Sequence, residues 1–465
     1  MKIHWAGKRV LIIGAARQGL ALARFLAARG AQVTLNDQRT EAQMQNAIDS
    51  LAGLPVQWSL GSHPLELLDS ADLMAVSGGV PLTLPIIVEA ERRGLPLTND
   101  SQIFMDAVRA PVIGITGSAG KTTTTTLVGR MAEHFAQAIG RRAWVGGNIG
   151  LPLVEYVDEI QPDDIVVVEF SSFQLEQMTT SPLIAAILNI TPNHLDRHGT
   201  LEAYTAAKAR ILAFQGADGA AVLSREDPGS WNLRETVRGR LVSFGIDAPD
   251  SKEANAIATY LHGDRLMACG PQGEVELMPR SLIELRGEHN LRNVLAACAV
   301  ALVAGIPVES IQAGVRGFGG VAHRLELVRQ WNGVRWYNNS IDTAPERTIA
   351  AIQAFEEPLV VLLGGRDKNL PWEKLAELLH QRVDHVVVFG EAAPKILQAI
   401  GPLRAGARLQ TIAQQPGLQA AVSAAANIVE DGDVVLLSPG GTSFDEFKDF
   451  EERGERFREW VKALS

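Results

Sequence analysis

The sequence is poor in cysteine and aromatic residues, and it has no long apolar run. Only Cys269 and Cys298 occur among 465 residues, which excludes a disulfide framework, and their spacing is not that of a metal site. No uninterrupted apolar stretch approaches the ~18 residues that span a membrane, so we expect no membrane insertion. Residues 1–7 lack the apolar core of a signal peptide. These absences favour a cytoplasmic protein.

Basic residues are not concentrated anywhere along the chain. The formal net charge is −10, and no Lys/Arg run of the kind that binds nucleic acid occurs. Apolar residues make up 46% and charged residues 21%, which is typical of a protein with a well-formed core. At roughly 100–200 residues per domain, the length predicts two to four domains. We expect a monomer that acts on small molecules and binds no nucleic acid.

One pattern occurs four times, a short apolar strand that ends in a glycine-containing turn. The four segments are residues 10–14, 112–117, 359–365 and 434–441. Strands that alternate with helical stretches predict parallel sheets, whose ligands gather at the carboxyl ends of the strands. We therefore predict an α/β protein of three domains. These are a Rossmann-like domain over residues 1–98, a P-loop ATPase-like domain over 99–320 and a second Rossmann-like domain over 321–465.

The segment from Gly114 to Thr123 is the most informative part of the sequence. It follows an apolar, β-branched run and opens into a helical pattern, which is the geometry that holds a phosphate against backbone N–H groups and a helix dipole. Lys121 adds a charge, and Thr122 places a hydroxyl where Mg²⁺ can bind. The strict P-loop pattern requires glycine where this chain has Ile115, so the loop is a variant. The predicted phosphate-binding residues are Gly117, Ser118, Ala119, Gly120, Lys121, Thr122 and Thr123.

Two further strand ends and one helix carry candidate site residues. Glu169 ends an apolar strand and suits magnesium, although a cap or an ion pair is the alternative. His194 alone would be structural, but at a strand end and two residues from Asp196 it becomes a site candidate. Asn290 and Asn293 are suited either to a nucleotide base or to capping the helix that follows.

The N-terminal glycine turn fits a dinucleotide site only in part. Gly14 and Gly19 are present and Asp37 has the Rossmann spacing, but Ala16 takes the place of the middle glycine. A tight turn without cofactor is at least as good an interpretation. The later turn over residues 77–81 adds backbone N–H groups to the same crevice.

The C-terminal strand ends in Pro439-Gly440-Gly441-Thr442-Ser443, and a helix is expected to follow directly. Phe444, Phe447, Phe450 and Phe457 recur at helical spacing. Such a stripe is typical of a core, which we expect for Phe447 and Phe457. Ser443 and Glu446 together resemble a capping box, which predicts another anion-binding helix start there.

Taken together, these segments resemble the Mur ligases, the ATP-dependent amino-acid-adding enzymes of peptidoglycan synthesis. The run Glu169-Phe170-Ser171-Ser172-Phe173-Gln174-Leu175 and the block over residues 438–447 resemble the glutamate-adding branch in particular. The resemblance covers essentially the whole chain. It implies that ATP phosphorylates the carboxylate of UDP-N-acetylmuramoyl-L-alanine and that the amine of D-glutamate then attacks the acyl phosphate.

The resemblance also implies roles for individual residues. Thr122 and Glu169 would hold one Mg²⁺, and Lys208, as a carbamate, would help His194 hold a second; from the sequence alone Lys208 reads as a solvated helix charge. The catalytic set is Lys121, Glu169, His194 and Lys208. Asn290 and Arg324 would face ATP. The UDP substrate would lie at Asp37, Ser77, Gly79 and Asn148, which replaces a dinucleotide in the N-terminal crevice. The glutamate pocket would comprise Thr343, Lys368, Ser443 and Phe450.

The chain departs from the family pattern in one segment near these pockets. The family usually has Asp-Ser-Lys-Ala-Thr where this chain has Asn339-Ser340-Ile341-Asp342-Thr343. Two single positions in the N-terminal part also differ, with Gln18 in place of the usual Ser or Thr and Gly78 in place of the usual proline. Ordinary drift is one explanation. The other is a changed amino-acid choice, as in related ligases that add L-glutamate.

Two other classes of protein share part of this pattern. A folylpolyglutamate-type ligase has the same P-loop chemistry, but the ~110 residues before this P-loop argue against it. A non-catalytic homologue would be expected to lose Lys121, Glu169, His194 or Lys208, and all four are present.

Overall fold

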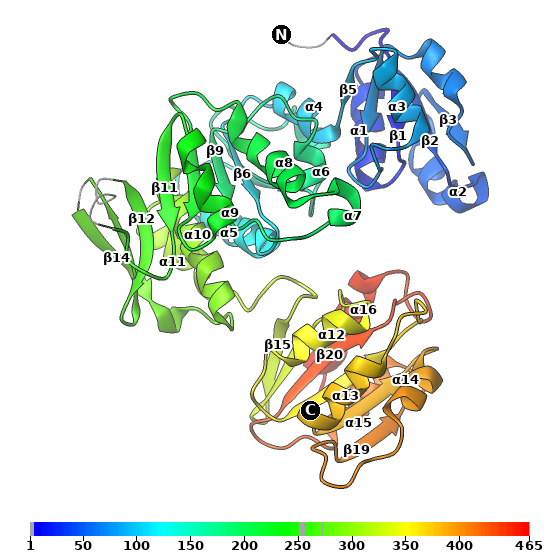
Figure 1. Ribbon diagram of the computed structural model, residues 1–465, viewed down its shortest axis with the longest axis vertical. Coiled ribbons are helices and arrows are strands. Elements are labelled where there is room, and N and C mark those ends of the chain that lie inside the picture. Colours follow the sequence, from blue (N-terminus) through cyan, green and yellow to red (C-terminus); the bar gives the residue numbers. More distant parts are fainter. Residues whose placement is uncertain (1–3, 251–255, 272, 465) are drawn as a thin grey trace. The chain divides into compact units, whose positions relative to one another are not determined.

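The computed structural model describes residues 4–250, 256–271 and 273–464. It contains three β-sheets with helices packed on them (Figure 1). Two sheets belong to one compact unit that ends at Arg316, and the third belongs to a second unit that comprises residues 284–287 and 317–465. The predicted α/β fold with three sheets is confirmed. The predicted boundaries at residues 98 and 320 stay predictions.

The N-terminal sheet is wholly parallel, in the order β3-β2-β1-β4-β5. Its strands are β1 (Arg9–Ile13), β2 (Gln32–Asp37), β3 (Val56–Leu60), β4 (Leu73–Val76) and β5 (Leu97–Thr98). Its helices are α1 (Arg17–Ala27), α2 (Glu41–Ser50), η1 (Leu65–Ser70) and α3 (Pro85–Arg92), and α4 (Asp100–Ala107) follows. The order reverses on either side of β1, so a crevice is expected at the carboxyl ends of β1 and β4.

The central sheet has nine strands in the order β14-β13-β12-β11-β10-β9-β6-β8-β7, and only the pairs β12–β13 and β13–β14 are antiparallel. The strands are β6 (Val112–Thr116), β7 (Ala143–Gly147), β8 (Ile165–Glu169), β9 (Ile184–Ile187), β10 (Ala220–Ser224), β11 (Arg240–Phe244), β12 (Ile257–His262), β13 (Arg265–Gly270) and β14 (Gly273–Pro279). The strand β6 is buried along its whole length, as its continuous apolar sequence predicts.

The helices of this part of the unit are mostly short, except for three. They are α5 (Lys121–Ala138), η2 (Leu153–Tyr156), α6 (Ser172–Leu175), α7 (Leu195–His198), α8 (Leu201–Ala213), α9 (Pro228–Trp231), η3 (Asn232–Thr236), η5 (Arg280–Leu282), α10 (Glu288–Val303) and α11 (Val308–Val315). The helix α5 packs against α10 and α11. A Cβ at Gly314 would lie 2.7 Å from the Met131 amide nitrogen, so glycine is what allows α11 to approach α5 so closely.

The third sheet has the order β15-β16-β20-β17-β18-β19, and only β15 pairs antiparallel. Its strands are β15 (Glu326–Trp331), β16 (Val334–Asn338), β17 (Leu359–Gly364), β18 (His385–Phe389), β19 (Thr411–Gln414) and β20 (Val434–Gly440). Its helices are α12 (Pro345–Ile352), α13 (Glu373–Arg382), α14 (Ala393–Ile400), α15 (Leu418–Ala426) and α16 (Phe450–Lys462). Alternate residues of β17 enter two separate cores, with Val361 and Leu363 in one and Val360 and Leu362 in the other. Both faces are therefore covered, and polar loops remain only at the strand ends.

The helix predicted to start at Ser443 begins seven residues later, so that prediction is wrong. Asp449 caps α16, because its carboxylate accepts a hydrogen bond of 2.8 Å from the Glu452 amide. The Ser443 carbonyl instead accepts from the Phe447 amide at 2.9 Å in a turn. Asp449 is the better N-cap, since Glu451 and Glu452 follow it in the first turn and favour the helix dipole.

Candidate active site

The glycine-rich loop joins β6 to α5, as the sequence predicts. Gly120 is the N-cap of α5 and has a φ of +80°, a conformation that a side chain disfavours. A Cβ at this position would lie 2.2 Å from Asn293 Oδ1. The first amide groups of α5 lack intrahelical acceptors and point along the helix axis, which suits an anion.

Asn189, two residues beyond β9, braces this loop. Its backbone carbonyl accepts from the Ser118 amide at 2.9 Å, and its side-chain oxygen accepts from the Ala119 amide at 2.8 Å. The Ser118 hydroxyl in turn donates to the Thr191 carbonyl at 3.0 Å. No sequence motif singled out Asn189; its one signal was a position just past the end of a buried strand. The segment that follows β9, the neighbour of β6 in the sheet, thus fixes the conformation of the loop.

Lys121 folds back over the loop. Its ammonium donates to the Gly117 carbonyl at 2.9 Å and to the Ser118 carbonyl at 3.3 Å. The charge therefore lies directly above the glycine turn, where a phosphate would need it.

Glu169 connects the P-loop with the loop after β7. Its Oε2 accepts from the Thr122 hydroxyl at 2.9 Å, and its Oε1 accepts from the side-chain nitrogen of Asn148 at 2.8 Å. The strand register brings Glu169 close to Thr122 and Asn148, because Glu169 lies opposite Ile115 of β6 and Gly147 of β7. The carboxylate is only 1% exposed. Carboxylate and hydroxyl oxygens at this point are a donor set that fits Mg²⁺.

Lys208 is buried on α8, so its interpretation as a solvated helix charge is wrong. It is 1% exposed, and its ammonium donates to the Gly117 carbonyl at 2.9 Å. It also lies 4.7 Å from the ring centre of Tyr204, whose hydroxyl donates to Ser118 Oγ at 3.0 Å. Burial, with a smaller effect of the Lys121 charge, lowers the pKa of Lys208 to about 7. A large fraction of this amine is therefore neutral, and nucleophilic, near neutral pH.

His194 lies just before α7 in a left-handed conformation, with a φ of 53°. Its side chain is exposed and meets the ring of Phe173 edge-on, with 5.1 Å between the ring centres. Within the described ranges, no three His, Cys, Asp or Glu side chains form a ready-made metal cluster. The grouping of His194 with Lys208 around a metal stays a prediction.

A cavity of about 360 Å³ opens beside the P-loop. Its lining residues are Ala119, Gly120, Leu188, Asn189, Thr191, Ser224, Glu226, Asp227, Phe244, His289, Arg292 and Asn293. Asn293 donates to Asn290 Oδ1 at 3.1 Å, so both asparagines lie at this cavity or next to it. Arg292 pairs with Glu226 at 2.6 Å, a long-range contact that the sequence analysis did not anticipate. The position and the mixed polar and apolar lining suit a nucleoside.

Three of the four predicted UDP residues, Asp37, Ser77 and Gly79, lie at the carboxyl edge of the N-terminal sheet, whereas Asn148 follows β7 of the central sheet. Asp37 accepts from the Ala15 amide at 2.8 Å and pairs with Arg39 at 2.7 Å. Burial opposes its ionisation, but these two partners outweigh burial and hold the pKa of Asp37 well below its usual range. Ser77 donates to the Gly14 carbonyl at 2.9 Å. The turns after β1, β2 and β4 thus meet at one edge of the sheet.

The same compact unit joins this edge to the central sheet. Gln18 donates to the Gly147 carbonyl and Arg17 to the Asn148 carbonyl, each at 3.4 Å. Arg197 donates to the carbonyls of Gly79 and Val80 at 3.3 and 2.9 Å. These contacts link the carboxyl edge of the N-terminal sheet to the loop after β7 that carries Asn148.

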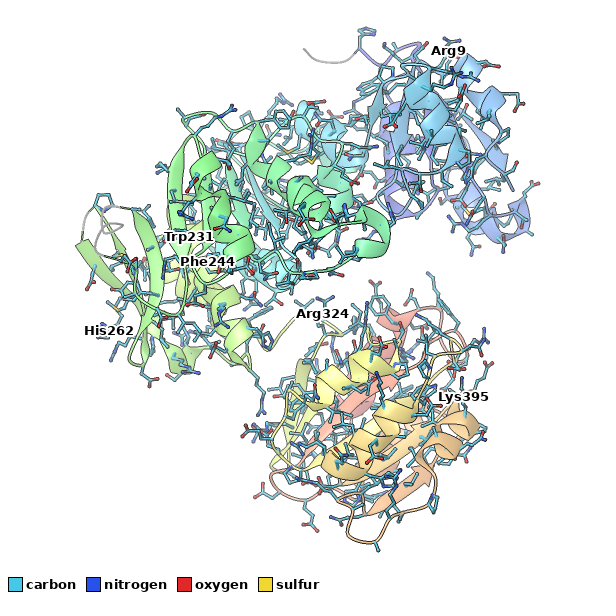
Figure 2. The ribbon with its side chains drawn as sticks, viewed as in Figure 1. Arg9, Trp231, Phe244, His262, Arg324 and Lys395 are labelled. Atoms are coloured by element: carbon cyan, nitrogen blue, oxygen red, sulfur yellow. The ribbon has the colours of Figure 1, made fainter. Side chains whose placement is uncertain are left out.

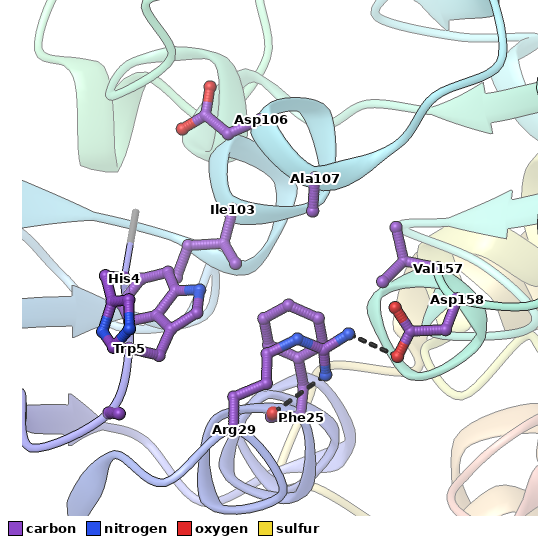
Figure 3. Close-up of a pocket in the computed structure, with 10 residues that line it drawn as sticks. His4, Trp5, Phe25, Arg29, Ile103, Asp106, Ala107, Val157 and Asp158 are labelled. Atoms are coloured by element: carbon purple, nitrogen blue, oxygen red, sulfur yellow. Dashed lines mark hydrogen bonds and ion pairs between the residues drawn. The ribbon is translucent and has the colours of Figure 1, made fainter. Parts of the chain in front are cut away.

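A separate cavity of about 370 Å³ lies in this unit, and none of the predicted site residues lines it (Figure 3). Trp5, Phe25, Ile103 and Val157 give it apolar walls. Arg29 lies over Phe25, 3.6 Å from the ring centre, and is paired with Asp158. The charges of Arg29 and Asp158 at this cavity are thus already paired with each other.

The second unit holds the predicted glutamate residues. Lys368 is exposed and donates to the Thr343 hydroxyl at 3.0 Å, and Ser443 is buried. Phe450 opens α16, and its carbonyl accepts from the Ser340 hydroxyl at 2.8 Å. Arg324, labelled in Figure 2, is exposed just before β15. Whether these groups bind glutamate and ATP stays a prediction.

Arg453, which no sequence pattern singled out, is fully buried in the second unit. Its guanidinium donates to Ser340 Oγ at 2.9 Å, to the Ser340 carbonyl at 2.8 Å and to the Gly441 carbonyl at 3.1 Å. Burial lowers its pKa to about 10. An arginine among acidic residues in an amphipathic helix gives no local signal of burial.

No helix in the described part of the chain is long and apolar enough to cross a bilayer.

Three family profiles match successive parts of the sequence. The profile for the Mur ligase MurD-like N-terminal domain matches residues 8–99, and that for the Mur ligase middle domain matches residues 115–301. The profile for the Mur ligase glutamate ligase domain matches residues 323–441.

Curated relatives match over nearly the whole length. Proteins named UDP-N-acetylmuramoylalanine–D-glutamate ligase from Pelotomaculum thermopropionicum and Symbiobacterium thermophilum are 41% and 39% identical to this chain. Each match spans 459 residues and covers 98% of both chains.

Solved structures share the fold at lower identity. The crystal structure of the UDP-N-acetylmuramate–alanine ligase MurC from Thermotoga maritima has a TM-score of 0.55 at 19% identity, over 98% of this chain and 99% of that one. A crystal structure of MurF from Acinetobacter baumannii has a TM-score of 0.54 at 20% identity, over 93% of this chain and 86% of that one. With successive domain profiles and full-length relatives in agreement, this chain belongs to the Mur ligase family.

Proposed function

We propose that this ligase joins D-glutamate to UDP-N-acetylmuramoyl-L-alanine, using ATP to convert the substrate carboxylate into an acyl phosphate. As a Mur ligase it is an ATP-dependent enzyme that forms an amide bond. The printed names of its full-length relatives support the choice of substrates. Because peptidoglycan determines cell shape and division, we expect the activity to serve wall growth.

The observation that carries the proposal is the meeting of Thr122, Glu169 and Asn148. Thr122 belongs to the P-loop and Asn148 to the loop after β7, which is linked to the carboxyl edge of the N-terminal sheet, and both donate to the Glu169 carboxylate. A nucleotide on the P-loop and a UDP-sugar in the crevice would therefore bring their reacting ends to the same carboxylate. Such positioning is the main demand of phosphoryl transfer.

The P-loop would bind the phosphates of ATP, and the cavity beside it the nucleoside. Lys121 would turn from the Gly117 and Ser118 carbonyls to the β- and γ-phosphates, where its charge matters most as the phosphoryl group moves. Asn293 lines this cavity and donates to Asn290, and the two would face the base. Arg324 would supply a further cation from the second unit.

Magnesium would be held by Thr122 and Glu169, with Lys208 and His194 at a second site. Bound Mg²⁺ would neutralise phosphate charge at these positions. The neutral amine of Lys208 can form a bond to the carbon of CO₂ and release a proton, which leaves a carbamate oxygen donor in place of an ammonium. Its burial and its lowered pKa favour this modification.

The glutamate would bind to the second unit. Lys368 and the Thr343 hydroxyl offer donors for one carboxylate, and Ser443 offers another hydroxyl. The glutamate amine would then attack the acyl phosphate with loss of inorganic phosphate.

A second candidate is the same ligase with L-glutamate as its substrate. The observation in its favour is the departure over residues 339–343, because Thr343 ends that segment and contacts Lys368. A folylpolyglutamate-type ligase is less well supported, since the N-terminal profile matches a Mur ligase domain. A non-catalytic homologue is disfavoured because Lys121, Glu169, His194 and Lys208 are all retained.

The decisive experiment measures ATP-dependent phosphate release with UDP-N-acetylmuramoyl-L-alanine and either D- or L-glutamate. We expect release with D-glutamate, and loss of at least ~10² in turnover in Lys121→Ala. Preference for L-glutamate would support the second candidate. Release with neither enantiomer, or near-normal turnover of Lys121→Ala, would contradict the proposed mechanism.

A further inference from the structure

Two of the departures from the family pattern, Asn339 and Asp342, contact each other. The Asn339 side-chain amide donates to Asp342 Oδ2, and the Ser438 hydroxyl lies 3.3 Å from both side chains. All three residues are buried, with exposures of 2%, 8% and 0%. The lost acid at one position and the gained acid at the other are therefore a single local change.

The other end of the Asn339 amide holds the segment that carries Arg324. Asn339 Oδ1 accepts a hydrogen bond of 3.1 Å from the Leu325 amide. The backbone of the same loop adds a second link, from the Ile341 amide to the His323 carbonyl at 3.1 Å. Arg324 is thus fixed on both sides by residues 339–341.

This segment requires such support because it is strained. His323 has a φ of 63° and Leu325 a φ of 45°, a left-handed conformation that is unfavourable for a non-glycine residue. Strained backbone persists only where its surroundings enforce it, and it concentrates at functional sites. Without the Asn339 acceptor, the Leu325 amide would lose the partner that keeps Leu325 left-handed.

Only one carboxylate fits into this arrangement. The side-chain oxygen of Asn339 accepts from the Leu325 amide, and its side-chain nitrogen donates to Asp342, so both polar atoms of the Asn339 side chain are in use. An acid at position 339 would accept from Leu325 equally well but would place two carboxylates in contact, and like charges in a buried site repel strongly. An acid at 339 with an amide at 342 would reverse the hydrogen bond and keep one charge.

We propose that Asn339 and Asp342 form one positioning unit that fixes Arg324 for ATP, and that the unit holds a single carboxylate which either position can supply. The inference rests on the proposed function in one respect, the role of Arg324 toward ATP. It makes the two departures a coupled exchange and assigns them to the nucleotide side of the reaction.

The test compares Asn339→Asp, Asp342→Asn and the exchange Asn339→Asp/Asp342→Asn in the full-length protein. We expect Asn339→Asp to raise the KM for ATP by about tenfold or more and to lower the Tm, and the exchange to restore both to within about threefold and a few degrees. The KM for the UDP-sugar should stay unchanged in every variant. Asn332→Asp is the matched control, because it makes the same chemical change at an exposed turn.

A merely structural role would lower the Tm and the active fraction while leaving the KM for ATP unchanged, and that result would overturn the proposal. Equal impairment of the exchange and of Asn339→Asp would overturn the single-carboxylate claim. If Asn339→Asp does not fold, Asn339→Ala removes both hydrogen bonds without adding charge and should still raise the KM for ATP.

Arg324→Ala separates this inference from the function on which it rests. A raised KM for ATP in Arg324→Ala, with a parental value in Asn339→Ala, would contradict only the positioning role. A parental KM in Arg324→Ala would contradict the assignment of Arg324 and the positioning role with it, and the Tm of the exchange would then decide the single-carboxylate claim by itself.

Discussion

The Thr122 hydroxyl donates a hydrogen bond of 2.9 Å to Glu169 Oε2, although the two residues are 47 positions apart in the chain. The contact places a hydroxyl of the first turn of α5 beside the carboxylate that ends β8. Oxygen donors in this arrangement suit a magnesium ion that also contacts ATP.

Replacing Glu169 with Gln should therefore lower turnover by at least ~10² and raise the Mg²⁺ concentration needed for half-maximal rate. The amide keeps the shape but loses the charge that binds the cation. Phosphate release measured across a Mg²⁺ titration checks this. Glu159→Gln, an exposed change near Arg142, is the control and should behave as the parent. Parental Mg²⁺ dependence in Glu169→Gln would remove Glu169 from the metal site.

The lowered pKa of Lys208 predicts a dependence of stability on pH. The pKa of Lys208 is about 7 in the folded protein and 10.5 in the unfolded chain. Between these two pH values the unfolded state binds more protons than the folded state, so the free energy of unfolding rises with pH. Below about pH 7 the penalty for a buried ammonium is present in full. Lys208→Met should remove this contribution, so its Tm should rise less than that of the parent between pH 7 and 10. Identical slopes for the two proteins would show that Lys208 is not the titrating group. The comparison needs CO₂-free buffer, because a carbamate would titrate differently.

Gly120→Ala should raise the KM for ATP by about tenfold, because the new Cβ pushes Asn293 away from Asn290 at the cavity wall. Gly140 provides a matched control, since it has a similar φ of +69° but no atom within 4 Å of an added Cβ. Both variants carry the strain of a left-handed alanine, and only Gly120→Ala carries the contact. Equal values of the KM in the two variants would mean that strain alone acts. Kinetics with varied ATP and thermal melts measure the two effects separately.

Arg453→Met should destabilise the second unit by roughly 2–4 kcal/mol, because three buried acceptors lose their donor. It should also raise the KM for glutamate, since Ser340 and Gly441 border the predicted pocket. Arg456→Met is the comparison within the same helix; its exposed pair with Glu459 contributes little, so its stability should be close to that of the parent. Denaturant unfolding of both variants checks this, and equal stabilities would contradict the assigned role of the burial.

Much of the fold was predictable because its signals are local. Apolar strands that end in glycine turns indicated β1, β6, β17 and β20, and the Gly-Lys-Thr run located the start of α5. The ligase class came from the resemblance of two sequence blocks to the Mur ligases, and the family membership confirms it. Such features depend on neighbouring residues, so a single sequence contains them.

The helix start near Ser443 shows where local reasoning failed. The predicted capping box at Ser443 lies six residues before the observed N-cap, Asp449. Asp449 caps the helix because its carboxylate accepts a hydrogen bond from the Glu452 amide and because acidic residues follow it in the first turn.

Tertiary structure alone decided which residues meet. The strand order β9-β6-β8-β7 brings Asn189, Thr122, Glu169 and Asn148 to one edge, and no local pattern encodes that order. The packing of α8 buries Lys208 and thereby lowers its pKa, although its flanking residues resemble those of a surface helix. The sequence by itself determined the strands, the phosphate loop and the chemical groups available, because these follow from short-range periodicity and residue type. Their proximity, burial and charge state depend on contacts between distant segments, and only the folded chain forms those contacts.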